Sequence, residues 1–205
     1  MTISETCRLA KEHANAAAFS SEADKNKMLS LAADALLARR GEILAANAED
    51  LNRFTRQDSL RDRLVLTESR IAGIAEGLRQ LTALPCPVGE VIEEHATASG
   101  LDIARVRVPF GVVGIIYEAR PNVTADAIGL CLKSGNAVVL RGSKDAYFSN
   151  AAIVRVMKEA IAAGGFDPEF IQLLEDCTRE GAREFMRQKA YLDVLIPRGS
   201  AALIQ

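Results

Sequence analysis

The sequence has few of the residues that build metal sites and disulfide frameworks. Its four cysteines, Cys7, Cys86, Cys131 and Cys177, lie far apart, and no Cys-x-x-Cys pair occurs. Only two histidines accompany them, so none of the usual zinc-ligand spacings is present. We expect four reduced thiols and no metal. Cys7, Cys86 and Cys177 lack the neighbouring histidine or helix start that would activate a thiolate, and Cys131 lies between leucines within a predicted helix and is expected in the core, so each is disfavoured as a nucleophile.

Long apolar runs and an excess of charge of one sign are also lacking. No stretch approaches the roughly 20 apolar residues that span a membrane, and the first residues include Glu5, Lys11 and Glu12 in place of a signal-peptide hydrophobic segment. The 25 Lys and Arg residues nearly balance the 27 Asp and Glu residues. This balance gives no basis for binding nucleic acid or an anionic membrane. We expect a cytoplasmic protein whose partner is a small molecule.

Apolar residues are plentiful, at 49% of 205 residues, which is enough for the core of one domain or slightly more. The first third of the chain has helical spacing. Ser21 and Asp24 resemble a capping box, and apolar residues follow at helical intervals as far as Ile43, which predicts one helix. A further helix is predicted from Thr67 until Pro85 interrupts the pattern.

Beyond the connector at residues 85–89, the pattern becomes that of strands. Apolar and arginine residues alternate over 104–108, which predicts a strand with one solvent-exposed face. The continuous apolar run VVGIIY is typical of a strand covered on both faces in a parallel sheet. This run is the first of four predicted strands, which lie at 112–117, 137–140, 171–174 and 192–196. The helices between them are predicted at 124–133, 150–163 and 181–188. This alternation predicts a doubly wound α/β layer.

In open parallel sheets, ligands bind at the carboxyl ends of the strands, so the residues after each strand are candidates for a site. Arg141, Gly142, Ser143 and Lys144 follow the second of these strands, and their cations, hydroxyl and permissive glycine suit phosphate or ribose oxygens. A solvated surface loop is the alternative interpretation. Neither a G-x-G-x-x-G fingerprint nor a P-loop lysine motif occurs, which disfavours an ordinary Rossmann or P-loop site.

Two other strand ends carry polar residues. Arg198, Gly199 and Ser200 lie where a helix N-terminus could present amides to a pyrophosphate, although an ordinary strand-to-helix turn has the same pattern. Asn122 follows Pro121 at the end of the first strand of the parallel layer. Its amide could donate to a developing oxyanion, or it could serve as a turn residue or helix cap.

The segment VPFGVVGIIYEARPNVTADAIGLCLKSGNAVVLRGSKDA resembles the aldehyde dehydrogenase superfamily. YEARPNVT, LKSGNAVVLRGSK and the closing DVLIPRGSAALIQ are similar to its gamma-glutamyl phosphate reductase family, and the resemblance covers essentially all 205 residues. It implies an α/β fold: an aldehyde-dehydrogenase-like, Rossmann-type parallel sheet with an N-terminal helical segment. Residues 1–100 are expected to form that segment and to pack on an incomplete NADP-binding domain at 101–205. The chain is expected to be truncated before the catalytic domain.

The resemblance also implies an activity and the roles of particular residues. The family reduces L-glutamyl 5-phosphate to L-glutamate 5-semialdehyde with NADPH and releases phosphate, by way of a cysteine thioester. Asn122 matches the superfamily asparagine that stabilises the oxyanion. Arg141 stands where typical members have a lysine that contacts the adenosine ribose, and Lys144 where many have a glutamate, so a cation there favours NADPH. The cofactor-binding residues implied are Arg141, Gly142, Ser143, Lys144, Arg198, Gly199 and Ser200.

No residue up to Gln205 matches the nucleophilic cysteine of the family. The chain alone is therefore expected to be inactive, and the complete enzyme is expected to be a homo-oligomer. Two alternatives stay open. The chain could come from a superfamily reductase of another acyl phosphate or aldehyde, or it could be a non-catalytic nucleotide-binding or assembly module.

Overall fold

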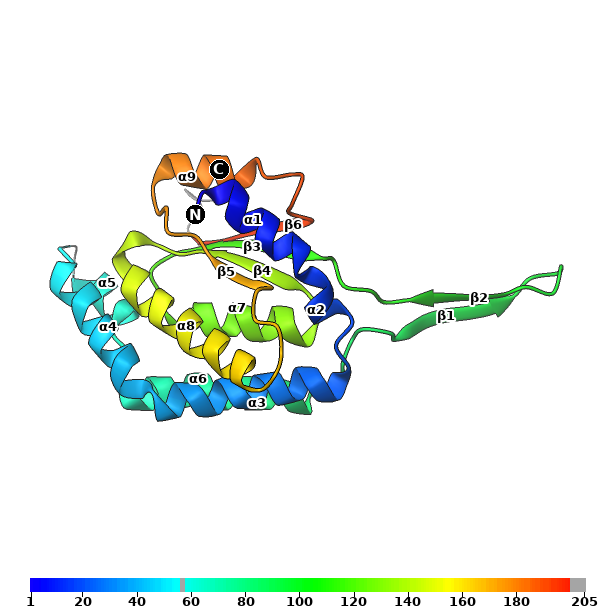
Figure 1. Cartoon of the computed structure of the whole chain (residues 1–205), viewed down its shortest axis with the longest axis horizontal. Helices are drawn as coiled ribbons and strands as arrows, with labels where there is room; N and C mark the ends of the chain where they lie inside the picture. The colour runs from blue at the N-terminus through cyan, green and yellow to red at the C-terminus, as the bar shows by residue number, and fades with distance from the viewer. Residues whose placement is uncertain (56–57, 200–205) are drawn as a thin grey trace.

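The computed structural model describes residues 1–55 and 58–199. A parallel sheet lies at the centre, helices cover both of its faces, and a two-stranded hairpin projects from one end (Figure 1). The helices are α1 (Ile3–Glu12), α2 (Ala14–Ala18), α3 (Glu22–Ala38), α4 (Arg40–Arg53), α5 (Asp58–Leu64), α6 (Glu68–Ala83), α7 (Asn122–Lys133), α8 (Tyr147–Ala163) and α9 (Arg179–Met186), with a short 3-10 helix η1 (Lys144–Ala146). The strands are β1 (Val91–Ala96), β2 (Asp102–Val106), β3 (Val112–Tyr117), β4 (Ala137–Arg141), β5 (Ile171–Leu173) and β6 (Val194–Arg198).

The central sheet has the order β5-β4-β3-β6, and all of its neighbouring strands are parallel. Every residue of β3 and β4 is buried, which explains why their sequences show no polar alternation. The predicted parallel α/β layer is confirmed. The last strand begins at Val194, two residues later than predicted.

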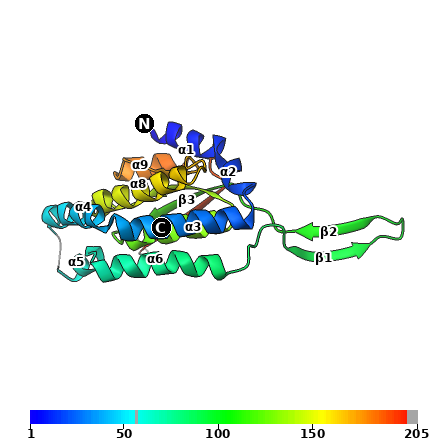
Figure 2. The ribbon, with the colours of Figure 1, turned by 60° about the horizontal axis from the view of Figure 1, so that its bottom comes forward.

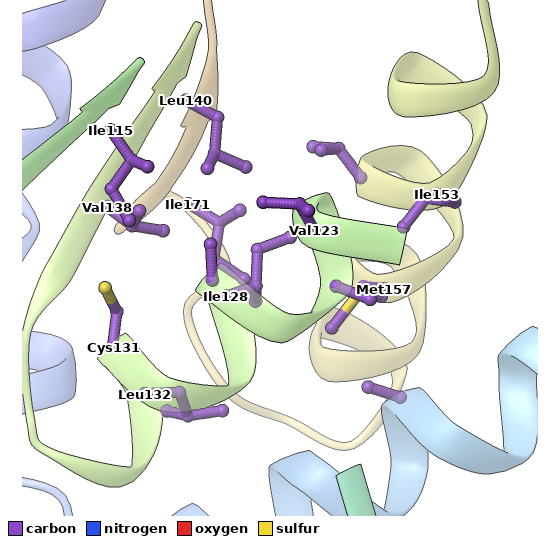
Figure 3. Packing of buried hydrophobic residues seen from close by; sticks show 14 of the residues in the cluster. Ile115, Val123, Ile128, Cys131, Leu132, Val138, Leu140, Ile153, Met157 and Ile171 are labelled. Carbon is purple, nitrogen blue, oxygen red and sulfur yellow. The ribbon is translucent and has the colours of Figure 1, made fainter. Parts of the chain in front are cut away.

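Helices lie on the two faces of this sheet in the doubly wound manner. α7 and α8 cover one face, with α3 and α6 outside them, whereas α1 and α9 lie on the other (Figures 1 and 2). Figure 3 shows Ile128 of α7 lying between Val138 and Ile171 of the sheet and Met157 of α8. These side chains are almost fully buried and form one continuous core with the N-terminal helices.

Two predicted helix starts in the N-terminal region are confirmed, and one predicted helix is wrong. The hydroxyl of Ser21 caps α3 and that of Thr67 caps α6, each accepting a hydrogen bond from the amide three residues later. The single helix predicted as far as Ile43 is interrupted at Arg39, which has φ −107° and ψ 22°. The break lets α4 turn toward α8, where buried Asn47 donates to the Ser149 hydroxyl at 3.0 Å.

The strand predicted to have one buried face is also different in the structure. β2 pairs with β1 in an antiparallel hairpin, and all the residues of both strands are exposed. The hairpin projects away from the body, so no other described part of the chain covers either face (Figure 2). The alternation of apolar and arginine residues therefore identified a strand correctly. It could not show that this strand lies away from the core. Residues 100 and 101, the proposed domain boundary, lie between β1 and β2.

Candidate functional site

A cleft of about 820 Å³ opens at the carboxyl ends of β3, β4 and β5, and we call it the strand-end cleft. Residues that directly follow these strands form most of its wall, as the topology of a parallel sheet requires. The cations on its wall are Arg63, Arg120, Arg141, Lys144 and Arg179, and the carboxylates are Glu118 and Asp145. The excess of positive charge suits an anionic ligand such as a nucleotide.

Arg141, at the end of β4, is 8% exposed and holds the neighbouring loop in place. Its Nη2 donates to the backbone oxygens of Cys177 at 2.7 Å and Thr178 at 2.5 Å. The buried Nε has no hydrogen-bond partner among the described residues. Arg141 therefore joins β4 to the segment between β5 and α9, and it adds positive charge at the floor of the cleft.

The three residues after Arg141 have different surroundings. A Cβ on Gly142 would lie 2.3 Å from Nδ2 of Asn150, so close packing already requires glycine here, whether or not a ligand approaches. Ser143 caps η1, since its hydroxyl oxygen accepts from the Asp145 amide at 3.2 Å. Lys144 is exposed on the cleft wall, and within the described chain no hydrogen bond or ion pair engages its ammonium group.

A second cleft of about 470 Å³ adjoins the first at the N-terminal end of α7, and we call it the Asn122 cleft. Asn122 is the first residue of α7 and is exposed there. Its Nδ2 donates to Oδ2 of Asp126 at 3.2 Å, which leaves the other N–H of the amide available to a ligand. Desolvation raises the pKa of Asp126, although the Asn122 amide and the charge of Arg198 oppose the rise. Arg63 and Arg120 line both clefts.

Arg198 and Gly199 lie apart from the strand-end cleft. Arg198 ends β6 beside Tyr117 of β3 and lines a third, mostly apolar groove of about 430 Å³ with Phe110 and Leu130. The structure thus brings Arg141, Ser143 and Lys144 into one cleft and places Asn122 in the adjoining one. Ser200 lies outside the described residues.

The thiol within the strand-end cleft is not activated by its surroundings. Burial raises the pKa of Cys177, and the nearby charge of Arg141 only partly opposes this. Burial likewise raises the pKa of Cys7 and Cys131 to about 12. All three thiols are therefore protonated near neutral pH and are poor nucleophiles.

Sequence reasoning missed three of the cleft cations. Arg179 follows β5, and applying the strand-end rule to that strand as well would have identified it. Arg120 lies within YEARPNVT, two residues before Asn122, and nothing in that segment distinguishes it from an ordinary surface arginine. Arg63 comes from α5, far away in the sequence, and only tertiary packing brings it to the sheet edge.

Comparisons with known proteins agree with this architecture. The aldehyde dehydrogenase family model matches residues 1–202. The gamma-glutamyl phosphate reductase of Anoxybacillus flavithermus is 50% identical over 198 residues, covering 95% of this chain and 48% of the relative. That of Neisseria gonorrhoeae is 52% identical over 184 residues, covering 89% of this chain and 44% of the relative. The chain thus spans about half the length of these curated relatives.

Solved structures give the same relationship. The crystal structure of gamma-glutamyl phosphate reductase from Thermotoga maritima superposes with a TM-score of 0.97 and 39% identity, over 100% of this chain and 50% of that one. The Saccharomyces cerevisiae gamma-glutamyl phosphate reductase gives 0.90 and 29%, over 100% of this chain and 53% of that one. The resemblance predicted from the sequence is confirmed. With a family match over nearly all its residues, the chain belongs to the aldehyde dehydrogenase family.

Proposed function

We propose that the chain is the nucleotide-binding portion of an NADPH-dependent gamma-glutamyl phosphate reductase. The complete enzyme would convert L-glutamyl 5-phosphate to L-glutamate 5-semialdehyde and phosphate, a step of proline biosynthesis. The observation that carries this proposal is the cationic strand-end cleft with Lys144 on its wall, whose ammonium group pairs with no other described residue. The identity of about half of the aligned residues to named gamma-glutamyl phosphate reductases supports the choice of reaction.

Within this proposal most of the predicted site residues have a role in binding the nucleotide or the substrate. Lys144 pairs with the 2′-phosphate of NADPH, because an exposed ammonium group on the cleft wall can reach a phosphate. Arg141 keeps the wall in shape through the Cys177 and Thr178 carbonyl groups. The pyrophosphate is proposed to lie near Arg198 and Gly199 at the end of β6, because Arg198 is paired with Tyr117, which lines the strand-end cleft. Ser200 is proposed to contact it as well and lies outside the described residues. NADPH, when bound, would supply the hydride.

Asn122 is proposed to act on the substrate carbonyl. Its free amide N–H donates to the oxygen of that carbonyl as negative charge develops there. The nucleophile is proposed to come from the part of the longer relatives that this chain does not cover, because burial raises the pKa of the thiols of Cys7, Cys131 and Cys177. The isolated chain would then bind nucleotide without turnover.

The proposal extends to the organisation of the protein. Residues 1–100 form the helical segment and residues 101–205 the nucleotide-binding domain, with the hairpin of β1 and β2 crossing from one to the other. The complete enzyme is proposed to work in the cytoplasm as a homo-oligomer. Among the described helices, none has both the length and the apolar character needed to cross a bilayer.

Calorimetric titration of the 205-residue chain with NADPH and with NADH tests the nucleotide assignment. We expect NADPH to bind more tightly, and Lys144→Glu to remove that preference by weakening NADPH binding about tenfold or more, as expected when a charge-assisted contact becomes a repulsion. Lys189→Glu is the matched control, because Lys189 is an exposed lysine outside all three clefts. A folded Lys144→Glu chain that still prefers NADPH as strongly as wild type would contradict the assignment.

A further inference from the structure

Arg63 and Arg120 occupy the junction between the strand-end cleft and the Asn122 cleft, since both residues line both cavities. Both are exposed, and over residues 1–55 and 58–199 neither guanidinium group takes part in a hydrogen bond or ion pair. Arg70, in the same region, is different. It donates to the backbone oxygens of Asp62 at 2.6 Å and Val65 at 2.7 Å, so it supports the local fold.

The surroundings of this pair favour an anion over a cation. α7 starts directly after Arg120 and Pro121, has no acidic residue in its first turn, and has no side-chain cap at its N-terminus. The positive end of its dipole therefore adds to the charge of the two arginines. The two carboxylates that line the Asn122 cleft are already engaged: Asp62 pairs with Arg70 at 3.0 Å, and Asp126 accepts from Asn122.

We infer that Arg63 and Arg120 form a phosphate site. It binds the phosphate of the acyl phosphate substrate next to Asn122 and retains inorganic phosphate after the reaction. This inference rests on the proposed function. In that reaction the carbonyl carbon forms a bond to the thiolate sulfur, the carbon–oxygen bond to phosphate breaks, and the oxygen leaves with the electron pair. Two guanidinium groups beside the leaving oxygen compensate its growing negative charge, and their fork of donors matches phosphate geometry.

The other source of phosphate near this junction is the nucleotide itself. Lys144 and Arg179 line only the strand-end cleft, whereas Arg63 and Arg120 also reach the cleft of Asn122, the proposed oxyanion donor. A phosphate between the two arginines is thus adjacent to the reacting carbonyl and distinct from the 2′-phosphate at Lys144. Binding measured with and without NADPH separates the two sources.

The test is an NMR titration of the isotopically labelled 205-residue chain with inorganic phosphate, with and without saturating NADPH. Amide signals of Arg63, Arg120 and Asn122 should shift with phosphate in both arms. Arg63→Gln and Arg120→Gln should each weaken this binding about tenfold, the loss expected for one charge-assisted contact. Both variants should leave the fold intact, since neither side chain bonds to the described chain. Arg187→Gln, an exposed arginine outside the three clefts, should change nothing.

Each outcome of this titration decides the inference. Phosphate shifts confined to Lys144 and Arg179, shifts abolished by NADPH, or a folded chain whose Arg63 and Arg120 signals never respond would overturn it. Unchanged phosphate binding in the Arg63→Gln and Arg120→Gln variants would do the same. A chain that binds phosphate at these arginines but does not bind NADPH would contradict the nucleotide assignment and leave the phosphate site standing.

Discussion

The carboxylate of Asp193 accepts a hydrogen bond from the backbone amide of Val112, with Oδ2 2.8 Å from the nitrogen. Nζ of Lys11 in α1 lies 2.6 Å from the same oxygen. The Asp193 side chain thereby joins the start of β3 and helix α1 to the segment that leads into β6. The Asp193 carboxylate lies so close to the backbone of Gly111 that a Cβ on this residue, which has φ +117°, would lie 2.2 Å from Oδ2.

Removing this carboxylate should destabilise the sheet. Asp193→Ala is expected to lower the free energy of unfolding by about 1–2 kcal/mol, the range for a lost hydrogen bond to a charged group at a partly exposed position. Urea denaturation measures the change. Glu94→Ala, at an exposed position in β1, should stay within about 0.5 kcal/mol of wild type. Equal unfolding midpoints for wild type and Asp193→Ala would show that the carboxylate does not stabilise the sheet.

The contribution of Asp193 should depend on pH. Partial burial acts to raise the pKa of this carboxyl, but hydrogen bonds from Lys11 and from the Val112 amide outweigh it, so the pKa lies below the usual value of 3.8. The stabilisation is therefore complete above the unfolded pKa and is lost as pH falls through the folded pKa. Denaturation at pH values from about 6 to 3 should show the advantage of wild type over Asp193→Asn shrinking. A constant difference would contradict the linkage.

Gly142 and Gly77 should respond to alanine in opposite directions. A Cβ at Gly142 would lie 2.3 Å from Nδ2 of Asn150 and 3.3 Å from the ring of Tyr117, so Gly142→Ala should cost about 1–3 kcal/mol through overpacking. Gly77, inside α6, has no neighbouring atom within 4 Å of such a Cβ, and Gly77→Ala should stabilise by about 0.5–1 kcal/mol. Thermal and urea unfolding compare the two, and a neutral Gly142→Ala would refute the packing argument.

Substitutions at Arg141 and Lys144 should affect different properties: the first should lower stability, and the second should change the preference between NADPH and NADH. Arg141→Gln removes the bonds to the Cys177 and Thr178 carbonyl groups and should cost about 1–3 kcal/mol of unfolding free energy. Lys144→Gln should change stability by less than about 0.5 kcal/mol, yet reduce the preference for NADPH over NADH. Denaturation and calorimetry on the same preparations test both. A destabilised Lys144→Gln chain would contradict the role of Lys144 as a nucleotide contact only. An Arg141→Gln chain as stable as wild type would contradict the structural role of Arg141.

Part of the site could be predicted because strand ends are visible in the sequence. Arg141, Ser143 and Lys144 follow a buried apolar strand, and a parallel sheet must place them at its carboxyl edge. Arg63 gave no such signal, because the path of α5 back to that edge depends on packing between helices far apart in the chain. The break at Arg39 was missed for a related reason. Helical spacing continues across it, and only contact with α8 shows that the axis turns.

By itself, the sequence determined the parallel sheet and its helices α7, α8 and α9, because buried strands and helix ends are local patterns whose meaning does not depend on distant residues. The motifs YEARPNVT and LKSGNAVVLRGSK identified the family. Only the tertiary structure decided which cations share a cleft, that Gly142 is constrained by Asn150, and that both faces of the hairpin are exposed. These features depend on which surfaces meet when the chain closes on itself. The spacing of apolar residues in the sequence shows which face of a helix or strand is apolar. It does not show which other part of the chain covers that face.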